Sequence, residues 1–521
     1  MKSALRLFVL AIGVAVLGGC AALPPPVERT PSVHIPASLG NALGKLAVQS
    51  VPAGKGSGFR PMPYSTWAMD ARLTLAQHAQ KSLDIQYYLL QNDMTGHTLV
   101  KAVRDAALRG VRVRLLVDDL YTAENDRMLL QLAAFPNIEI RLFNPFPAGR
   151  AFAFTRWFFA IGDFARVNHR MHNKMFIADG AFAIAGGRNI ADEYFFNSKG
   201  GNFVDFDILV AGDAVPRMAA IFDTYWNSPR VYPLYDLEQS RDPPEKLRAA
   251  FDELTADAGQ GYPPLSRTDA DALGYLPLSA DMPHPPLKLL FGSIDVFADD
   301  PEKVSGKAER GDDRSTVMYR VMQAMRSARL GIDIASPYFI PGKPGMDAMQ
   351  YAHDNGVRMS VMTNSMASND EPYASAAYAR YRVAMLKLGV NMYEIDSSQL
   401  KNDALFGGIL RQSIGRSHSK IVLIDDHITF VGSMNMDFRS ALSNTELGML
   451  IESPELASDL LDLSARLRAG AYRLRLAQPG DKVQWLGTVS GQEKVYEDEP
   501  GVGFGTRLEL LLFPFISENL L

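Results

Sequence analysis

Two stretches of this sequence share one pattern and decide the fold: MHNKMFIAD at residues 171–179 and SHSKIVLID at residues 417–425. In each stretch a lysine follows a histidine by two residues, and an aspartate follows that lysine by five. Equivalent positions lie 246 residues apart (418 − 172, 420 − 174 and 425 − 179). Unequal loops would scramble so constant an offset, so we interpret the chain as two copies of one unit. The candidate catalytic residues are His172, Lys174, Asp179, His418, Lys420 and Asp425.

Each stretch has the pattern of a β-hairpin. Side chains at positions i and i+2 of a strand point to the same face, so the histidine and the lysine of each copy point together. The aspartate comes where the chain turns back toward an apolar run, 181–185 or 428–431, and turn capping is an alternative to a catalytic role for it. An asparagine, Asn189 or Asn435, follows each histidine by 17 residues. Each copy therefore offers one imidazole, one ammonium and one carboxamide to a common site.

The segments before the hairpins repeat as well. Residues 83–88 and 110–117 have the pattern of strands on either side of a helix at 98–108, and a similar strand–helix–strand pattern covers residues 332–362. This order favours right-handed crossovers and parallel strands. We therefore predict an α/β fold of two similar domains, with mixed, mainly parallel sheets and flanking helices, packed about a pseudo-twofold axis.

Composition divides the chain further. A stretch rich in proline and aspartate at residues 236–286 predicts a linker between a first domain at 56–235 and a second at 287–521. The prolines of residues 20–55 predict a stiff, extended tether. The composition of 47% hydrophobic and 21% charged residues is that of a globular protein and excludes a disordered, collagen-like or polytopic membrane protein. A net charge of −5 argues against a nucleic-acid partner.

The N-terminus predicts export and lipidation. Lys2 and Arg6 lead into the apolar run 7–19, which as a helix rises only ~20 Å at ~1.5 Å per residue and is too short to span a bilayer. We therefore predict a signal peptide at residues 1–19. Cys20 follows it and is the single cysteine of the chain, which excludes an intramolecular disulfide and a zinc site built from cysteines.

The residues 17–20, LGGC, resemble the bacterial lipoprotein box. That resemblance implies cleavage before Cys20, acylation of Cys20, and a lipid anchor on the periplasmic side of the cell envelope. Because Ala21 rather than aspartate follows, it further implies the outer membrane. An ordinary exported protein with an incidental cysteine is the alternative.

The duplicated polar set fits a phosphodiester. Lysines and asparagines would clamp the anionic phosphate oxygens. One histidine would attack phosphorus to form a phosphoenzyme, and the other would protonate the departing oxygen and then activate the incoming hydroxyl. A carboxylate behind each ring would fix its tautomer, and Asp205 and Glu446 are the candidates. Spacing leaves open which carboxylate serves which histidine. His169 and His172 could pass for a metal pair, but Lys174 beside them argues against it, so no metal or cofactor is expected.

The doubled motif resembles that of the phospholipase D superfamily, over nearly everything from residue 65 to the C-terminus. That resemblance implies two phospholipase D-like α/β domains, no metal requirement, His172 as the nucleophile and His418 as the acid/base. A closer similarity to cardiolipin synthase C-type enzymes lies in residues 142–146, 170–174, 186–190, 363–365 and 444–446. A lipoprotein box is not general among such synthases, which puts the inner membrane in doubt as the site of action.

These observations predict an enzyme of phospholipids at a membrane surface. The first hypothesis is phosphatidyl transfer through a phosphohistidine, with cardiolipin made from phosphatidylglycerol and a second phospholipid. The alternatives are a phospholipase D hydrolase that releases phosphatidic acid, a nuclease or other phosphodiesterase of the superfamily, and a lipid-anchored scaffold without activity. The expected partners are phospholipid substrates and the membrane that holds Cys20, with no nucleic acid.

Two apolar stretches leave a choice open. Residues 152–159 carry four phenylalanines and one tryptophan, with Arg150 and Arg156 interleaved. They are either buried core or an interfacial element with its rings in the headgroup zone and its arginines on lipid phosphates. The run at residues 508–516 raises the same choice.

Overall fold

The computed structural model describes residues 23–25, 29–123, 125–150, 152–259, 270–306, 313–400, 414–489 and 491–503. The predicted signal peptide, Cys20 with its lipidation, and the run at 508–516 lie outside the described residues. Within those ranges, no helix combines the length and the apolar character needed to cross a membrane.

Eight strands of the first half form one sheet in the order β9-β4-β3-β2-β5-β6-β8-β1. Their bounds are β1 (Ser57–Met62), β2 (Ser82–Tyr87), β3 (Arg112–Asp118), β4 (Ile138–Phe143), β5 (Met175–Ala178), β6 (Phe182–Gly186), β8 (Asp207–Gly212) and β9 (Val231–Pro233). The predicted crossover is present, because α4 (Met94–Leu108) connects the parallel strands β2 and β3.

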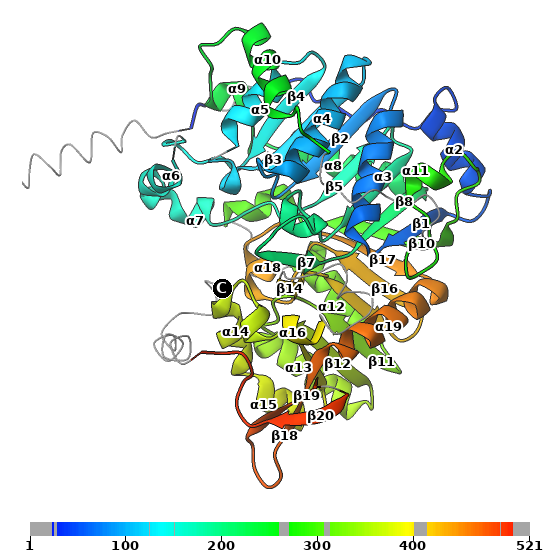
Figure 1. Cartoon of the computed structure of the whole chain (residues 1–521), viewed down its shortest axis with the longest axis vertical. Helices are drawn as coiled ribbons and strands as arrows, with labels where there is room; N and C mark the ends of the chain where they lie inside the picture. The colour runs from blue at the N-terminus through cyan, green and yellow to red at the C-terminus, as the bar shows by residue number, and fades with distance from the viewer. Residues whose placement is uncertain are drawn as a thin grey trace, which may run out of the picture.

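The second half repeats this order strand for strand, as β18-β13-β12-β11-β15-β16-β17-β10. Its strands are β10 (Leu290–Ala298), β11 (Gly331–Ala335), β12 (Arg358–Asn364), β13 (Asn391–Ile395), β15 (Ile421–Ile424), β16 (Ile428–Gly432), β17 (Leu447–Glu452) and β18 (Ala471–Leu476), extended by β19 (Val483–Val489) and β20 (Gln492–Tyr496). The predicted duplication is confirmed. Strands β1 and β10 pair antiparallel and join the two halves into one sheet of 18 strands (Figure 1).

The prediction of mainly parallel sheets holds only for the middle of each half. Strands β2, β3 and β4, and likewise β11, β12 and β13, are parallel. The other neighbours in the 18-stranded sheet are antiparallel, because the hairpins β5–β6 and β15–β16 and the strands beyond them reverse direction without a crossover.

Helices cover the sheet, and one apolar core runs between the halves. The principal helices are α3 (Ser65–His78), α5 (Asp126–Ala133), α8 (Ala214–Trp226), α12 (Val317–Arg326), α13 (Gly342–Asp354), α14 (Pro372–Ala379), α15 (Arg382–Lys387) and α19 (Pro454–Ala469). One buried cluster combines Phe59 and Phe222 of the first half with Met449, Ile451 and Leu460 of the second. Fully burying such a side chain contributes about 1.5–3 kcal/mol, so the common core holds the two halves together.

The predicted tether is folded onto the first half over much of its length. Arg29 donates to the Val231 carbonyl at 2.9 Å. Further along, residues 42–50 form the helix α2 (Ala42–Ser50), which buries Leu43, Leu46 and Ala47. The prolines that predicted an extended segment stop at Pro36, and the apolar spacing i, i+3, i+4 that follows them is that of an amphipathic helix.

The predicted linker also packs against the first half. It contains α9 (Leu234–Leu237), α10 (Pro244–Leu254) and α11 (Leu278–Asp281). Phe251 of α10 lies edge-on to Phe135, with ring centroids 5.3 Å apart. Asp70 of α3 accepts a hydrogen bond from the Ser279 backbone in α11 at 2.9 Å. The described parts of residues 236–286 therefore pack on the surface of the first half.

A second, smaller sheet lies at the junction of the halves. The strands β7 (Gly201–Val204) and β14 (Ile414–Ser417) pair in parallel, one from each half. Figure 1 shows them between the upper and lower halves, with the short helices α7 (Phe164–Val167) and α18 (Phe438–Leu442) on the same side. The chain runs from β7 directly into Asp205 and from β14 directly into His418.

Candidate active site

The two histidines of the duplicated motif are held at the junction, each by backbone of the opposite half. The His172 N–H donates to the carbonyl of Thr445 at 2.8 Å, and the His418 N–H donates to the carbonyl of Val204 at 2.8 Å. Each histidine lies just before the first strand of its hairpin, β5 or β15. Each histidine thus belongs to the hairpin of its own half, while a backbone hydrogen bond to the other half fixes its position.

The carboxylates pair with the histidines across the two halves. The Nδ1 atom of His172 lies 3.0 Å from Oε2 of Glu446, and the Nδ1 atom of His418 lies 2.7 Å from Oδ2 of Asp205. This resolves the pairing that spacing left open. A carboxylate at Nδ1 holds the proton there, which leaves the Nε2 lone pair of each ring as the reactive one.

The two carboxylates differ in their surroundings. Glu446 accepts hydrogen bonds from the hydroxyls of Ser433 and Ser440, and although burial opposes it, His172 and these contacts hold the pKa of Glu446 below its usual range. Asp205 accepts from the Phe206 backbone at 2.7 Å, and burial raises the pKa of Asp205. The counter-ion of His172 is therefore the more firmly ionised of the two.

The lysines lie directly beside the rings. Lys174 Nζ donates to the carbonyl of His172 at 2.6 Å, and Lys420 Nζ donates to the carbonyl of His418 at 2.7 Å. Lys420 Nζ also lies 3.0 and 3.1 Å from the two ring nitrogens of His418. Burial lowers the pKa of Lys420 to about 8 and that of Lys174 well below its usual range. An anionic ligand between them would offset that desolvation and favour their charged forms.

Burial and the lysines also act on the imidazoles. Burial lowers the pKa of His172 to about 4, and burial together with Lys420 lowers that of His418 well below its usual range. The charge of His172 acts on His418, and the charge of Lys420 acts on Lys174, so the groups form one electrostatic unit. Both rings are thus neutral at neutral pH in the absence of a ligand, and neutral imidazole is the nucleophilic form.

Two tyrosines, which the sequence analysis did not identify, pack edge-on against the histidines. The ring centroid of Tyr88 lies 4.9 Å from that of His172, and the centroid of Tyr194 lies 5.0 Å from that of His418. Tyr88 follows the last residue of the parallel strand β2, and this position at a carboxyl end was the available signal. The tyrosines restrict ring rotation and water access on one side of each imidazole.

The two asparagines follow the second strand of each hairpin. Asn189 donates its amide to the Tyr194 hydroxyl at 2.9 Å, which couples it to the ring beside His418. The backbone N–H of Asn435 donates to the Ser440 hydroxyl oxygen at 3.1 Å, and that hydroxyl in turn donates to Glu446. In the structure these residues thus support the two dyads. Their proposed contact with phosphate stays a prediction.

The assignment of Asp179 and Asp425 to the catalytic set needs correction. Asp179 has φ 53° in the turn of its hairpin, and its carboxylate accepts from the backbone N–H groups of residues 80–82. Asp425 has φ 54° and accepts from the N–H groups of residues 329–331. Each carboxylate ties a hairpin turn to the start of the neighbouring strand, β2 or β11, at the end of the hairpin remote from the histidine. The turn-capping alternative is the one that the geometry favours.

A buried ion pair supports the backbone before His172. Asp118, the last residue of β3, accepts from the Met171 N–H at 2.8 Å and lies 3.3 Å from Arg170. Arg170 also donates to the carbonyl of Asn144 at 3.0 Å. Asp118 was not predicted, although its place at the carboxyl end of a parallel strand is where functional residues of such sheets gather.

Within the described ranges, no group of three or more histidine, cysteine, aspartate or glutamate side chains is arranged to hold a metal ion. His169, the possible partner of His172 in a metal pair, has its Nδ1 atom 3.2 Å from the carbonyl of Val304. Two imidazoles and two amines are gathered in the site, where an anion would relieve their desolvation.

Comparison with known proteins agrees with this geometry. A family model described as "Cardiolipin synthase, PLD-like domain" matches residues 73–226 and 321–467. The chain is 37% identical over 465 residues to cardiolipin synthase C of Escherichia coli, which covers 87% of this chain and 94% of that protein. It is 26% identical over 407 residues to cardiolipin synthase 2 of Staphylococcus epidermidis, covering 77% of this chain and 67% of that protein.

A solved structure shares the fold. Phosphatidylserine synthase of Haemophilus influenzae superposes with a TM-score of 0.55 at 14% sequence identity, over 91% of this chain and 96% of that one. At this identity the likeness concerns the two-domain architecture alone.

Proposed function

This chain belongs to the family of PLD-like cardiolipin synthase domains, and from that premise we propose that it transfers a phosphatidyl group from one phospholipid to the hydroxyl of another through a covalent phosphohistidine. With phosphatidylglycerol as acceptor the product is cardiolipin. The observation that carries the proposal is the crossed pair of dyads, His172–Glu446 and His418–Asp205. It leaves two imidazole Nε2 atoms for one phosphorus, with Lys174 and Lys420 beside them.

In the first step the Nε2 lone pair of His172 attacks the phosphorus of the donor lipid. A P–N bond forms, and the P–O bond to the headgroup alcohol breaks. His418, which carries a proton on Nε2 once the anionic lipid is bound, gives that proton to the departing oxygen. Glu446 stabilises the positive charge that develops on His172, and Lys174 and Lys420 neutralise the phosphate oxygens.

In the second step the hydroxyl of the acceptor lipid gives its proton to Nε2 of His418. Its oxygen attacks phosphorus, the P–N bond breaks, and His172 is restored. The two steps use one acid/base in opposite directions, which requires Asp205 to support both protonation states of His418.

Burial of the reactive groups favours transfer over hydrolysis. His172 is 7% exposed and His418 is 4% exposed, and Tyr88 and Tyr194 cover one side of each ring. A site that admits little water protects a covalent phosphohistidine until a second hydroxyl arrives.

An apolar cavity beside the second hairpin supports a lipid substrate. Its volume is about 370 Å³, and it begins at Met436, the residue after Asn435. Met318, Met322, Phe339 and Phe438 contribute to its wall. Such a lining suits an acyl chain, whereas a nucleic acid would meet one arginine there, Arg326, together with Asp437.

The test is the identity of the lipid products. Purified protein is incubated with phosphatidylglycerol alone and with added phosphatidylethanolamine, and the lipids are analysed by mass spectrometry, with His172→Ala as the inactive control. Cardiolipin is the expected product. Phosphatidic acid as the sole product would make the protein a hydrolase, and cleavage of DNA with no lipid product would make it a nuclease. Because the mechanism uses side chains alone, a chelator should leave the rate unchanged.

We also propose that Cys20 anchors the protein by lipidation on the periplasmic side of the cell envelope, in the outer membrane. The support is the LGGC sequence at residues 17–20 behind an apolar run. Labelled palmitate should enter the wild-type chain and should not enter Cys20→Ser. Label retained by Cys20→Ser would refute the anchor, and fractionation of the two membranes tests the location.

A further inference from the structure

One segment of the first half exposes an unusual number of aromatic side chains. It follows β4 and contains α6 (Ala153–Phe159), a 3-10 turn (Ile161–Asp163) and α7, which ends shortly before Arg170. Figure 1 shows it projecting from one side of the molecule. We call residues 152–164 the aromatic excursion. Its exposed apolar side chains are Phe152, Phe154, Trp157, Phe158, Ile161 and Phe164, of which Phe152, Phe154 and Ile161 are 70%, 79% and 71% exposed.

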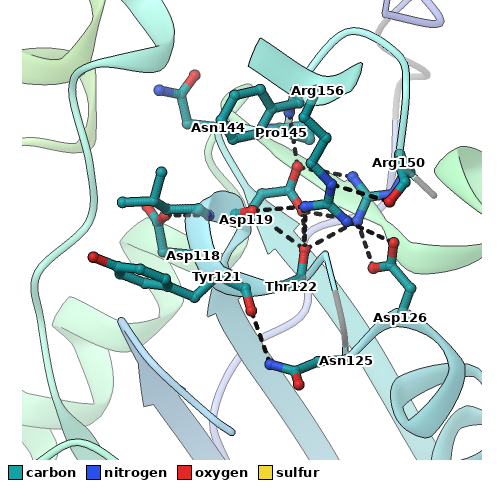
Figure 2. A network of polar contacts seen from close by, with 12 residues as sticks. Asp118, Asp119, Tyr121, Thr122, Asn125, Asp126, Asn144, Pro145, Arg150 and Arg156 are labelled. Atoms are coloured by element: carbon teal, nitrogen blue, oxygen red, sulfur yellow. Dashed lines mark hydrogen bonds and ion pairs between the residues drawn. The ribbon is translucent and has the colours of Figure 1, made fainter. Parts of the chain in front are cut away.

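The arginines of this segment point inward, as Figure 2 shows. Arg150 binds Asp119 and Asp126 at 2.7 Å each. Arg156 binds Asp126 at 2.7 Å and donates to the Thr122 hydroxyl at 2.8 Å. Both guanidinium groups are buried, so the expectation that they bind lipid phosphates is wrong. They form a bracket that fixes α6 to the loop after β3.

This bracket determines what the excursion presents to the outside. Arg156, the charged residue of α6, binds groups inside the protein and does not face solvent. A small buried cluster of Phe146, Ala160 and Val167 lies beneath the helices. Trp157 packs against Phe146 in a T-shaped contact, with ring centroids 5.1 Å apart, while Phe152 and Phe154 are exposed. A rigidly held apolar surface of this kind marks a place where another apolar phase makes contact.

The excursion is joined directly to the active site. Asn144, eight residues before the excursion, donates to the carbonyl of His169 at 2.7 Å. His169 lies five residues after the excursion and three residues before His172. Arg439 of α18, four residues after Asn435, donates to the carbonyl of Asn168 at 3.1 Å. The segments that flank the excursion are therefore tied to chain next to both copies of the catalytic motif.

The N-terminal segment reaches the same edge of the sheet. Arg29 binds the carbonyl of Val231, and Val231 pairs with Phe143, the last residue of β4. Arg29 lies nine positions after Cys20 (29 − 20). Nine steps of ~3.3–3.6 Å span at most about 30 Å, so a lipid on Cys20 would lie within that distance of Arg29.

We propose that the aromatic excursion inserts into the interface of a phospholipid membrane and holds the mouth of the active site against the lipid surface. The proposal rests on the proposed function for its substrate, and the insertion itself does not depend on catalysis. The rings enter the headgroup and upper acyl zone, where amphipathic aromatic side chains are stabilised. The Arg150–Arg156 bracket prevents the helix from folding back on the protein.

Trp157 provides a local probe of insertion. The chain has four tryptophans, and Trp226 and Trp485 are buried while Trp67 is only partly exposed. The full chain carrying Cys20→Ser is mixed with vesicles of phosphatidylglycerol and phosphatidylethanolamine that contain acyl chains brominated at defined depths. Quenching by shallow bromines, lost in Trp157→Phe, is the expected result. Fluorescence in Trp157→Phe that is quenched as strongly as in the parent would overturn the proposal.

Activity provides the second test. The double variant Phe154→Ser/Phe158→Ser is compared with the matched control Leu108→Ser/Leu330→Ser, whose leucines are 59% and 55% exposed and lie away from the site. Removing two inserting rings should reduce turnover of vesicle lipid at least about tenfold, and the control should not. Turnover of a short-chain phosphatidylglycerol dissolved as monomers should change less than about twofold in both variants, which also reports an intact fold.

The outcomes separate the two proposals. Equal losses of the double variant on vesicles and on monomers, or no loss on vesicles, would refute insertion. A wild-type chain that turns over neither substrate would refute the proposed function, while quenching of Trp157 would still decide insertion. Concentration-dependent dimers in light scattering that disappear in the double variant, without quenching by vesicles, would assign the surface to a second copy of the chain.

Discussion

The two dyads occupy equivalent places in a duplicated scaffold, yet they differ in electrostatics. On the His172 side, Glu446 is held by two serine hydroxyls and its pKa is lowered. On the His418 side, burial raises the pKa of Asp205, and Lys420 lies within 3.1 Å of both ring nitrogens. A firmly ionised partner suits a ring that must carry positive charge as a phosphohistidine. A more easily protonated partner suits a ring that gains and loses a proton in turn.

One pair of equivalent positions contributes to this difference. Gly187 and Ser433 are 246 residues apart and occupy the same place after β6 and β16. A Cβ atom on Gly187 would lie 2.1 Å from Oδ1 of Asp205, whereas the hydroxyl of Ser433 donates to Glu446. The shorter carboxylate thus packs against a glycine, and the longer one binds a serine. The two dyads therefore differ in the residue that contacts the carboxylate, Gly187 in one and Ser433 in the other.

The largest expected effect comes from removing each histidine in turn. His172→Ala and His418→Ala should each reduce phosphatidyl transfer by at least about 10⁴-fold, since each removes a nucleophile or an acid/base. A phosphatidyl-p-nitrophenol substrate distinguishes them, because its leaving group departs without a proton. His418→Ala should release up to one equivalent of p-nitrophenol and stop, and His172→Ala should release none. The reverse pattern would exchange the two roles.

The second-largest effect is expected from a substitution at Gly187 that disturbs the contact between His418 and Asp205. Gly187→Ala should displace Asp205 and reduce transfer by about 10²–10⁴-fold, similar to Asp205→Asn, because His418 loses the partner that sets its tautomer. Steady-state kinetics measure the loss, and a thermal melt confirms folding. In Asp205→Asn the additional loss from Gly187→Ala should be small, since both act on one contact. Full additivity of the two losses would refute the coupling.

The pH profile should show the two sides of the site separately. The p-nitrophenol substrate is used for this profile, because its leaving group needs no proton from His418. His172 must be neutral to attack, and burial lowers its pKa to about 4, so kcat/KM should rise with pH near that value. Lys420 must be charged to neutralise phosphate, and burial lowers its pKa to about 8, so kcat/KM should fall as pH rises above that value, by about tenfold per unit. Lys420→Arg keeps its charge at all these pH values and should remove the alkaline limb. An alkaline limb unchanged in Lys420→Arg would assign it to another group.

The smallest expected effect concerns the serine that distinguishes the two dyads. Ser433→Ala removes one hydroxyl from Glu446, while Ser440 still donates at 2.8 Å. A hydrogen bond to a charged group contributes about 1.5–3 kcal/mol, so transfer should fall by about 10–100-fold at most. The p-nitrophenol burst should slow in Ser433→Ala, because phosphohistidine formation uses Glu446. An effect confined to discharge of the intermediate would instead place Glu446 in the second step.

The sequence predicted the parts of this protein that depend on local pattern. The 246-residue offset predicted the duplicated hairpins, and strand–helix–strand order predicted the parallel strands around α4. It could not predict that Glu446 serves His172 and Asp205 serves His418, because that pairing depends on how the halves meet. The same limit applies to Tyr88, whose role arises only when β2 ends beside the junction.

Other predictions failed where a local pattern has two physical outcomes. Prolines at residues 24–36 predicted a tether, but in the described part of that stretch Arg29 and Ser32 form hydrogen bonds with the first half. Arginines between aromatic residues left open a choice between buried core and contacts with lipid phosphates, and in the structure Asp119 and Asp126 bind them. An aspartate at a turn has the same sequence pattern whether it acts in chemistry or caps backbone N–H groups, and at Asp179 it caps them.

The crossed pairing constrains how such a protein can have arisen and how it can be divided. Two separate copies of a single half, associated as a homodimer, could exchange carboxylates in the same way, but their two reaction centres would be chemically identical. In a single polypeptide the two equivalent positions can differ, and here position 187 is glycine while position 433 is serine. Conversely, neither fragment of a chain cut near residue 270 would hold a complete histidine–carboxylate couple, and activity would return only when both fragments were mixed.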